Sequence, residues 1–452
     1  MKQKLALMVG MARSGVSSTK LLASQGYRVI INDSKNSIPG LSEQLSGIEY
    51  IDALGRDPME LIDGVDLLVL SPVVPIFAPF AEEAKRRGVE VIGEIELGYR
   101  FSKGDFVCIS GTNGKTTTTA LTGEVFKAGG RNTFVLGNIG VPITEHALET
   151  REGDVIVAEV AALQLESIDR FHARAAAMLN ITEDHLNRFR ESMDEYVAAK
   201  CRIFENQTGD DFAVLNYDDP VVRDMAKLTR ARVLYFSRRE EVPEGAFVQG
   251  GEILFRMDGI LTRVLEADRV RIPGAHNLEN ALAATCLGLC MGLEAGRVAK
   301  ALMEFPGVEH RLEFVREIDG VRYINDSKAT NPDSSIKAVE AMTRPTVLLL
   351  GVGEYDKHSD FTPLFRAFGG RIKAVLASGL NVPAIERAAK ETGFAPVIEC
   401  ENDLGPMVDA ARGLAEPGDT VLLSPAAASW GLFEDYEHRG RVFKDVVAKL
   451  GN

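Results

Sequence analysis

The residues with the clearest chemical potential form the segment Ser110-Gly-Thr-Asn-Gly-Lys-Thr-Thr117, which follows an apolar stretch and precedes a helical pattern. Its two glycines allow main-chain amides to point inward, Lys115 sets a positive charge near terminal phosphates, and Thr116 offers a hydroxyl to Mg²⁺. The usual GxxxxGK[ST] spacing would place a glycine where Ile109 stands. The segment therefore predicts a phosphate-binding loop of a shorter GxxGKT type.

Two further apolar stretches end in side chains that could bind a metal. Val155-Ile-Val-Ala-Glu159 ends in a carboxylate, and Asn180-Ile-Thr-Glu-Asp-His185 follows another strand-like stretch. Because the carboxyl ends of parallel strands meet at one edge of a sheet, we expect Glu159 and His185 beside the phosphate loop. His185 would either bind a divalent ion or cap the next helix. Lys200 lies in a helical pattern that is typical of a surface lysine, and the sequence does not decide its role.

A second glycine loop, Gly10-Met-Ala-Arg-Ser-Gly15, stands near the N-terminus between a strand-like and a helical pattern. Free amides at a helix N-terminus favour a phosphate, and Asp33 follows the next strand, where a ribose or base contact is expected. Ala12 replaces the middle glycine of GxGxxG. The loop is compatible with a nucleotide site or with a structural turn.

Polar residues also gather in two later places. Asn277 and Asn280 are close together at the start of a helix expected over 277–303, suited to capping it or to binding an adenosine. In the last third of the chain, His310-Arg311 follows a Pro-Gly pair, and Asn325-Asp-Ser-Lys-Ala-Thr-Asn331 follows a strand-like stretch. Polar residues in such a loop more often serve function than packing.

Alternating strand and helix patterns around these motifs predict an α/β protein of three domains. Residues 1–93 read as a Rossmann-like domain and residues 94–306 as a P-loop ATPase-like parallel sheet, with antiparallel hairpins added after Asp210. Residues 307–452 read as a second Rossmann-like domain. Its expected strands lie near 321–325, 346–350, 372–377, 396–399 and 420–424, and its expected helices at 333–342, 383–391 and 432–449. The Pro306-Gly307 pair marks the second boundary, because proline and glycine interrupt a helical pattern there.

Composition limits the partners of this chain. The net charge is -14, which disfavours binding to nucleic acid or to an anionic membrane surface. The most apolar later stretch, residues 67–81, contains three prolines and is shorter than the ~20 residues that a membrane span needs. Five cysteines without metal or disulfide spacing indicate a reducing compartment, so we expect a cytoplasmic protein. We also expect a monomer.

Taken together, these motifs resemble the Mur ligase family, the ATP-dependent amide-forming enzymes of peptidoglycan precursor synthesis. The resemblance extends over nearly the whole chain and rests on five segments: GTNGKTT, GNIGVP (137–142), NITEDHLNR (180–188), AAKCRIF (198–204) and NDSKATN (325–331). Alanine-adding members usually have histidine where Asn113 stands, and GMARSG with Asp33 is similar to the type that binds a nucleotide sugar. The resemblance implies that ATP drives the joining of D-glutamate to UDP-N-acetylmuramoyl-L-alanine through an acyl phosphate.

The resemblance also implies a role for individual residues. ATP would be bound by Gly111, Thr112, Asn113, Gly114, Lys115, Thr116, Thr117, Asn277, Arg311 and Asp326. The UDP-sugar would be bound by Ser14, Asp33, Ser34, Ser71, Asn138 and Gln164, and D-glutamate by Thr330, Lys357, Ser429, Trp430 and Tyr436. Two Mg²⁺ ions would be held by Thr116, Glu159, His185 and Lys200, the lysine as a carbamate. The catalytic residues would be Lys115, His185, Lys200 and Lys328.

Some positions depart from the family pattern. Residues 161–163 read Ala-Ala-Leu where Ser-Ser-Phe is common, Val73 stands where glycine is usual, and Trp430, Gly431 and Tyr436 also differ. Two other interpretations therefore stay open. The chain could use another amino-acid acceptor, as other Mur ligases and folylpolyglutamate synthase do, or it could bind ATP as a sensor without turnover.

Overall fold

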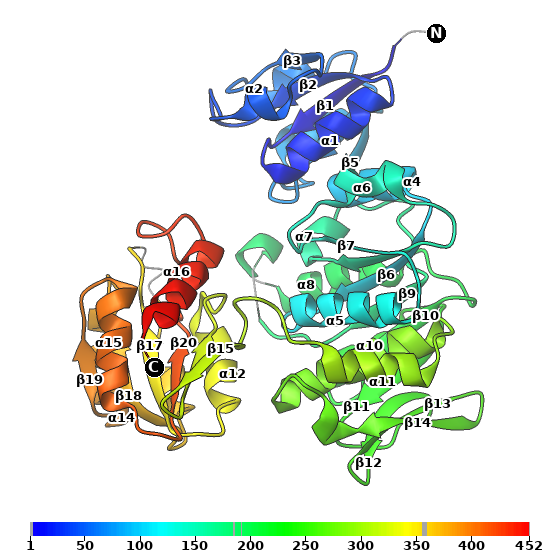
Figure 1. Cartoon of the computed structure of the whole chain (residues 1–452). Helices are drawn as coiled ribbons and strands as arrows, with labels where there is room; N and C mark the ends of the chain where they lie inside the picture. Colours follow the sequence, from blue (N-terminus) through cyan, green and yellow to red (C-terminus); the bar gives the residue numbers. More distant parts are fainter. Residues whose placement is uncertain (1–2, 184–185, 191, 355–358, 452) are drawn as a thin grey trace. The chain divides into compact units, whose positions relative to one another are not determined.

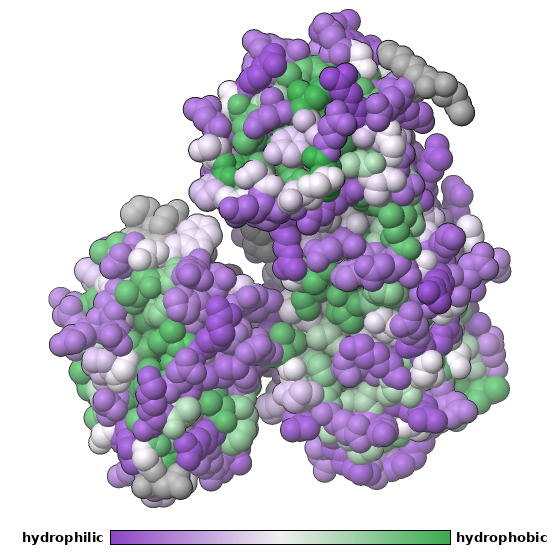
Figure 2. Space-filling model, turned by 45° about the horizontal axis from the view of Figure 1, so that its top comes forward, coloured by the Kyte–Doolittle hydropathy of each residue, from purple (hydrophilic) through white to green (hydrophobic). Residues whose placement is uncertain are grey.

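The computed structural model describes residues 3–183, 186–190, 192–354 and 359–451, which form three sheets in chain order (Figure 1). The chain divides into two compact units: Met1–Arg271 with His276–Phe305 is unit 1, and Ile272–Ala275 with Pro306–Asn452 is unit 2. Hydrophilic residues cover most of the face drawn in Figure 2, as the composition leads one to expect. The helices within the described ranges include none with the length and apolar character of a membrane span. The five cysteines are free thiols.

The first sheet of unit 1 has five parallel strands in the order β3-β2-β1-β4-β5. Its elements are β1 (Leu5–Val9), α1 (Arg13–Ser24), β2 (Arg28–Asn32), α2 (Leu41–Gln44), β3 (Tyr50–Asp52), η1 (Pro58–Leu61), β4 (Leu67–Leu70), α3 (Pro79–Arg86), β5 (Glu90–Gly93) and α4 (Glu94–Phe101). The central strands are apolar throughout because both faces of the sheet are buried. Strand order reverses between β1 and β4, which leaves a crevice at their carboxyl ends where ligands bind in such sheets.

The second sheet of unit 1 has nine strands in the order β14-β13-β12-β11-β10-β9-β6-β8-β7. Its first half comprises β6 (Asp105–Ser110), α5 (Lys115–Ala128), β7 (Thr133–Gly137), α6 (Ile143–His146), η2 (Ala147–Glu149), β8 (Val155–Glu159), α7 (Ala162–Leu165), β9 (Ala175–Met178), η3 (Leu186–Phe189), α8 (Met193–Cys201) and η4 (Arg202–Phe204). Strand β6 lies between β8 and β9, so the segments after these three strands meet at one edge.

The second half of this sheet corrects two expectations. It comprises β10 (Phe212–Asn216), α9 (Pro220–Asp224), η5 (Met225–Lys227), β11 (Arg232–Ser237), β12 (Gly245–Gln249), β13 (Glu252–Met257), β14 (Ile260–Glu266), η6 (Ala267–Arg269), α10 (Ala275–Cys290) and α11 (Ala295–Glu304). Strands β12, β13 and β14 pair antiparallel, which confirms the added antiparallel part. That part begins at Gly245 and not directly after Asp210, because β10, β11 and β12 pair in parallel. The expected helix over 277–303 is two helices, because the chain turns at Gly292 with a φ of 82°.

Unit 2 contains a six-stranded sheet in the order β15-β16-β20-β17-β18-β19. Its elements are β15 (Glu313–Ile318), β16 (Val321–Asn325), α12 (Pro332–Glu340), β17 (Thr346–Leu350), α13 (Thr362–Arg366), β18 (Ile372–Ala377), α14 (Val382–Thr392), β19 (Val397–Glu399), α15 (Leu404–Leu414), β20 (Thr420–Leu423) and α16 (Tyr436–Lys449). Among the described residues of this sheet, β15 and β16 are the one antiparallel pair. The order reverses between β17 and β20, so a second ligand crevice is expected after these strands. The sequence patterns missed β15, α13 and α15, and they began the last helix four residues too early.

Candidate active site

The phosphate loop follows β6 and opens α5, as the sequence predicts. Gly111 and Gly114 have positive φ angles of 146° and 85°, which favour glycine. A Cβ atom at Gly114 would lie 2.6 Å from Oδ1 of Asn280, so the loop also needs glycine for space. Asn180, which follows β9, accepts a hydrogen bond from the Asn113 amide at 2.8 Å through Oδ1 and donates to the Asn113 carbonyl at 3.1 Å. The loop is therefore fixed by the neighbouring strand end.

Lys115 places its ammonium group inside this loop. Its Nζ donates to the carbonyl oxygens of Gly111 and Thr112, both at 2.9 Å. Thr116 and Thr117, the next two residues of α5, are buried, with exposed fractions of 6% and 4%. The positive end of the helix dipole and a lysine thus meet at one turn, which is the arrangement that a polyphosphate requires.

Glu159 supplies a carboxylate at the same edge. It is the last residue of β8 and pairs with Ile109, at the entrance to the phosphate loop. Its exposed fraction is 2%, Oε1 accepts a hydrogen bond from Asn138 Nδ2 at 2.8 Å, and Oε2 has no hydrogen-bond partner among the described residues. A buried carboxylate oxygen without a hydrogen-bond partner is unfavourable unless a ligand contacts it. Glu159 with the Thr116 hydroxyl therefore fits Mg²⁺, which prefers hard oxygen ligands.

Lys200 is buried against the phosphate loop, so the surface-lysine interpretation is wrong. Its exposed fraction is 2% and its Nζ donates to the carbonyl of Gly111 at 2.9 Å. The same Nζ lies 4.9 Å from the ring centroid of Tyr196, whose hydroxyl is 3.1 Å from Oγ1 of Thr112. A buried lysine is costly as a cation, which is a reason for a chemical role. His185 lies outside the described residues.

The asparagine pair of α10 also borders the loop. Asn280 Nδ2 donates to Asn277 Oδ1 at 3.1 Å, and both residues are buried. Because α10 begins at Ala275, both amides lie inside the helix and not at its N-cap. The approach of Asn280 to Gly114 places this pair next to the phosphate loop.

The N-terminal glycine loop lies in the crevice between β1 and β4. The Met11 amide donates to Oδ2 of Asp33 at 2.8 Å, and the hydroxyls of Ser14 and Ser71 are 3.4 Å apart. Burial raises the pKa of Asp33, but hydrogen bonds from the Met11 and Lys35 amides outweigh it, so the pKa lies below its ordinary value. Asp33, Ser14 and Ser71 thus meet where strand order reverses.

The other residues predicted for the UDP-sugar are divided between two places in unit 1. Ser34 donates to Oδ1 of Asp33 at 3.4 Å and belongs to the same crevice. Asn138 contacts Glu159 at the phosphate-loop edge, and buried Gln164 accepts a hydrogen bond from the Ala161 amide at 2.9 Å. The Ala161 side chain cannot offer the hydroxyl that a serine would place there.

In unit 2, predicted residues lie after β16 and β20. Asp326 accepts hydrogen bonds from Ser424 Oγ at 2.8 Å and from the Leu312 amide at 3.2 Å, and burial raises its pKa to about 7. Lys328 Nζ lies 5.4 Å from the ring centroid of Tyr436. Ser429 is buried and Trp430 is 59% exposed. Lys328 and Thr330 follow β16 as expected, and Arg311 lies between the Pro306-Gly307 pair and β15. Lys357 lies outside the described residues.

Sequence reasoning missed Arg439, which is fully buried in α16. Its guanidinium donates to four oxygens: Ser327 Oγ at 3.0 Å, Ser327 O at 2.8 Å, Val352 O at 3.1 Å and Ala427 O at 3.0 Å. Burial lowers its pKa to about 9. These acceptors belong to the segments after β16, β17 and β20, so one side chain fixes all three. The pattern around position 439 is that of an exposed helix face and gave no signal.

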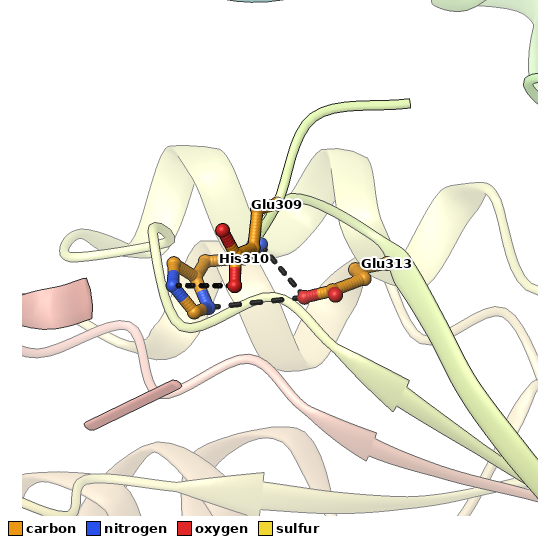
Figure 3. A group of neighbouring side chains, drawn as sticks. All are labelled: Glu309, His310 and Glu313. Atoms are coloured by element: carbon orange, nitrogen blue, oxygen red, sulfur yellow. Dashed lines mark hydrogen bonds and ion pairs between the residues drawn. The ribbon is translucent and has the colours of Figure 1, made fainter. Parts of the chain in front are cut away.

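A histidine and two carboxylates also meet in unit 2. Glu309, His310 and Glu313 have ligand atoms within 4.8 Å of one another (Figure 3). Lys444 Nζ donates to Glu309 and, at 3.0 Å, to Oε1 of Glu313, while Asn325 Nδ2 contacts His310 Nδ1 at 2.9 Å. The ammonium group of Lys444 already contacts both carboxylates, so we interpret the cluster as structural and not as a metal site.

The fold and the phosphate loop define a nucleotide-binding α/β enzyme, and comparison with known proteins identifies the family. Residues 4–93 match the Mur ligase MurD-like N-terminal domain, residues 109–288 the Mur ligase middle domain, and residues 310–427 the Mur ligase glutamate ligase domain. The chain belongs to the Mur ligase family, whose members are ATP-dependent ligases of peptidoglycan synthesis.

Relatives support this assignment over the full length. The UDP-N-acetylmuramoylalanine--D-glutamate ligase of Alkaliphilus metalliredigens is 48% identical, with 100% of this chain and 99% of the relative aligned. The protein of the same name from Clostridioides difficile is 42% identical, again over 100% of this chain and 99% of the relative. Among solved structures, UDP-N-acetylmuramate-alanine ligase from Thermotoga maritima covers 98% of this chain and 99% of its own, with a TM-score of 0.62 and 18% identity. That likeness concerns the fold.

Proposed function

We propose that this chain joins the amino group of D-glutamate to the alanyl carboxylate of UDP-N-acetylmuramoyl-L-alanine, using ATP. One observation carries the proposal. At the edge of the sheet that contains β6, Lys115 and the Oε2 atom of Glu159, which has no hydrogen-bond partner among the described residues, both lie at the phosphate loop. Full-length relatives at 42–48% identity are named for this reaction. The sensor interpretation predicts ATP binding without phosphate release, so turnover distinguishes it from this proposal.

The chemistry follows from the poor reactivity of a carboxylate toward an amine. A carboxylate oxygen of the alanyl group attacks the γ-phosphorus of ATP, the bond to the β-phosphate oxygen breaks, and ADP leaves with that electron pair. The amine of D-glutamate, having lost a proton, then attacks the acyl carbon, and inorganic phosphate leaves as the amide forms. Lys115 stabilises negative charge on the transferring phosphoryl group by its position inside the loop.

Mg²⁺ neutralises phosphate charge when it is bound, and Thr116 and Glu159 are the residues that would hold it. A second ion would be held by His185 and by Lys200 as a carbamate. Protonated lysine repels a cation, whereas its carbamate presents anionic oxygen. The burial of Lys200 and its position beside Gly111 of the phosphate loop support this role.

The substrates divide among the three predicted domains. Residues 1–93 would bind the UDP part through Ser14, Asp33, Ser34 and Ser71, with Asn138 and Gln164 of the central domain nearer the sugar. Residues 94–306 would bind ATP through the phosphate loop and Asn277. Residues 307–452 would bind D-glutamate, and they would add Arg311, Asp326 and Lys328 to the ATP site.

The D-glutamate site would lie in the crevice between β17 and β20. Thr330, Lys357, Ser429, Trp430 and Tyr436 are the proposed contacts, because two carboxylates need a cation and hydrogen-bond donors. Arg439 supports this proposal, since it bonds to Val352 after β17 and to Ala427 after β20, two residues before Ser429. We further propose a cytoplasmic monomer, in keeping with five free thiols.

Phosphate release from ATP tests the proposal. Release is expected only when UDP-N-acetylmuramoyl-L-alanine and D-glutamate are both present with Mg²⁺. A panel of other amino acids, including L-glutamate, L-alanine and L-lysine, serves as the control. Strong preference for another amino acid would overturn the D-glutamate assignment, and release without any acceptor would indicate an ATPase.

A further inference from the structure

A cavity of about 480 Å³ lies in unit 1 beside α1. Its walls come from α1, from Gln44 of α2, and from residues 144–149 of α6 and η2. It contains none of the residues predicted for ATP, D-glutamate, Mg²⁺ or the UDP-sugar. Its volume falls within the ~300–1,000 Å³ that is typical of small-molecule sites.

The apolar part of the wall comes from two elements. Val16 and Leu21 of α1 are buried at its base, and Leu148 of η2 is 53% exposed. A large side chain that is half exposed beside a concave surface leaves apolar area for a ligand to cover. The cavity therefore suits an occupant with an apolar body.

Among the described charged residues that line the cavity, Lys20 can interact with an occupant. Nε of Arg13 lies 3.9 Å from Oε2 of Glu145, and Glu149 contacts Nδ1 of His146 at 3.0 Å. Lys20, in the middle of α1, is exposed and has no hydrogen bond or ion pair within the described part of the chain. Arg13 has the Glu145 carboxylate near it, whereas Lys20 has no carboxylate partner among the described residues, so Lys20 favours an anionic group on the occupant.

The inner wall of the cavity connects three helices. Ser17 Oγ of α1 hydrogen-bonds Thr144 Oγ1 of α6, and the Thr144 amide and hydroxyl donate to Oε1 of Glu94 at 2.9 and 3.0 Å. Glu94 begins α4 and is buried. The distance between α1 and α6 is therefore set by a buried hydrogen-bond chain that forms part of this cavity.

Both helices continue into segments proposed to hold the UDP-sugar. Ser14 is in the first turn of α1, and α6 follows directly on the loop 137–142 that carries Asn138. A ligand between α1 and α6 would act on both segments at once, through the Ser17–Thr144 link.

We propose that this cavity binds a small molecule with an apolar body and one anionic group, and that its occupancy changes affinity for the UDP-sugar. The second half of this statement rests on the function proposed above, whereas binding in the cavity does not. By linkage, the UDP-sugar must change the affinity of the cavity by the same factor.

The binding half is tested with 8-anilinonaphthalene-1-sulfonate, an aromatic body with one sulfonate whose fluorescence rises in an apolar site. Titrations of the full-length protein with a non-hydrolysable ATP analogue present keep the probe out of the phosphate loop. Lys20→Glu should weaken binding about fivefold and Leu148→Asp about tenfold. Lys300→Glu and Leu228→Asp change exposed residues elsewhere in unit 1 and should have no effect. Absence of binding, or equal binding by all four variants, would overturn the proposal.

The coupling half is measured by calorimetry of UDP-N-acetylmuramoyl-L-alanine with and without the probe. We expect a two- to fivefold shift in Kd for the wild-type protein. Ser17→Ala should bind the probe within twofold of wild type but lose the shift, because Thr144 keeps its bond to Glu94 while the link to α1 is gone. A shift that persists in Ser17→Ala would contradict this route. Failure of the wild-type protein to bind the UDP-sugar would instead count against the proposed function.

Discussion

Residues 10–15 and 111–114 form two glycine turns with different surroundings. Each comes after the first strand of its sheet in chain order, and a helix begins at each turn. The first turn faces the Asp33 carboxylate and the hydroxyls of Ser14 and Ser71. At the second turn, Nζ of Lys115 donates to the Gly111 carbonyl, and the buried Nζ of Lys200 contacts the same carbonyl. On the function proposed above, both turns would bind nucleotides, and the side chains of neighbouring elements would decide which turn binds the UDP-sugar and which binds ATP.

Removing the cation from the second turn should have the largest effect. Lys115→Ala is expected to lower turnover about 10³-fold, because charge on the transferring phosphoryl group loses its main partner. UDP-sugar binding at the first turn should stay within twofold of wild type. Steady-state phosphate release and calorimetry measure the two effects.

The matched control is Lys127→Ala, which changes an exposed lysine on the same helix, α5. Full activity of Lys115→Ala would refute the phosphate role of this loop. Equal loss of UDP-sugar affinity would show that the two turns are not independent.

Neutralising the carboxylate beside the second turn should have the next largest effect. Glu159→Gln keeps the size and the bond to Asn138 but removes the charge that Mg²⁺ needs. Turnover at fixed Mg²⁺ should fall about 100-fold, and more Mg²⁺ should be required for half-maximal rate. Glu124→Gln, at an exposed position of α5, should leave the Mg²⁺ titration unchanged. An unchanged titration in Glu159→Gln would exclude metal ligation by this residue.

Changing the carboxylate of the first turn should have a smaller and separate effect. Asp33→Asn is expected to weaken UDP-sugar binding about tenfold, because hydrogen bonds with a charged partner are the stronger ones. ATP binding should not change. Ser34→Ala removes only a neighbouring hydroxyl and should cost less. If Asp33→Asn weakened ATP binding instead, the assignment of the two turns would have to be reversed.

The smallest effect concerns pH at the first turn. The pKa of Asp33 is lowered, so its charge and the contribution it makes are lost only when the pH falls below the ordinary range of an aspartate. Titration of the Asp33 carboxylate should therefore change the affinity for the UDP-sugar less than twofold between pH 8 and pH 5. Comparing wild type with Asp33→Asn by calorimetry checks this. A tenfold loss at pH 5 that is absent from Asp33→Asn would show that Asp33 titrates in this range.

The local sequence was sufficient to predict the site where the chemically important residues also determine the backbone conformation. The GTNGKT loop was placed correctly because glycine positions and a preceding apolar strand define it, and Glu159 was placed beside it because parallel strands end at one edge. Ser14 and Ser71 meet for the same reason, since they follow adjacent strands.

Local sequence was not enough where tertiary packing decides. A lysine in a helix is exposed or buried according to what covers that face, so burial of Lys200 could not be read from Tyr-Val-Ala-Ala-Lys-Cys-Arg. Arg439 was missed for the same reason. The parallel pairing of β10, β11 and β12 is set by connections and neighbours, and their short apolar runs fit antiparallel hairpins equally well.

Oxygen transfer tests the central claim of an acyl phosphate most directly. UDP-N-acetylmuramoyl-L-alanine labelled with ¹⁸O in its carboxylate would be turned over with ATP and D-glutamate, and the released phosphate analysed by ³¹P NMR. We predict one ¹⁸O atom in each phosphate, because the attacking carboxylate oxygen leaves with phosphorus. Phosphate without label, formed together with the amide, would contradict activation of the carboxylate by phosphoryl transfer.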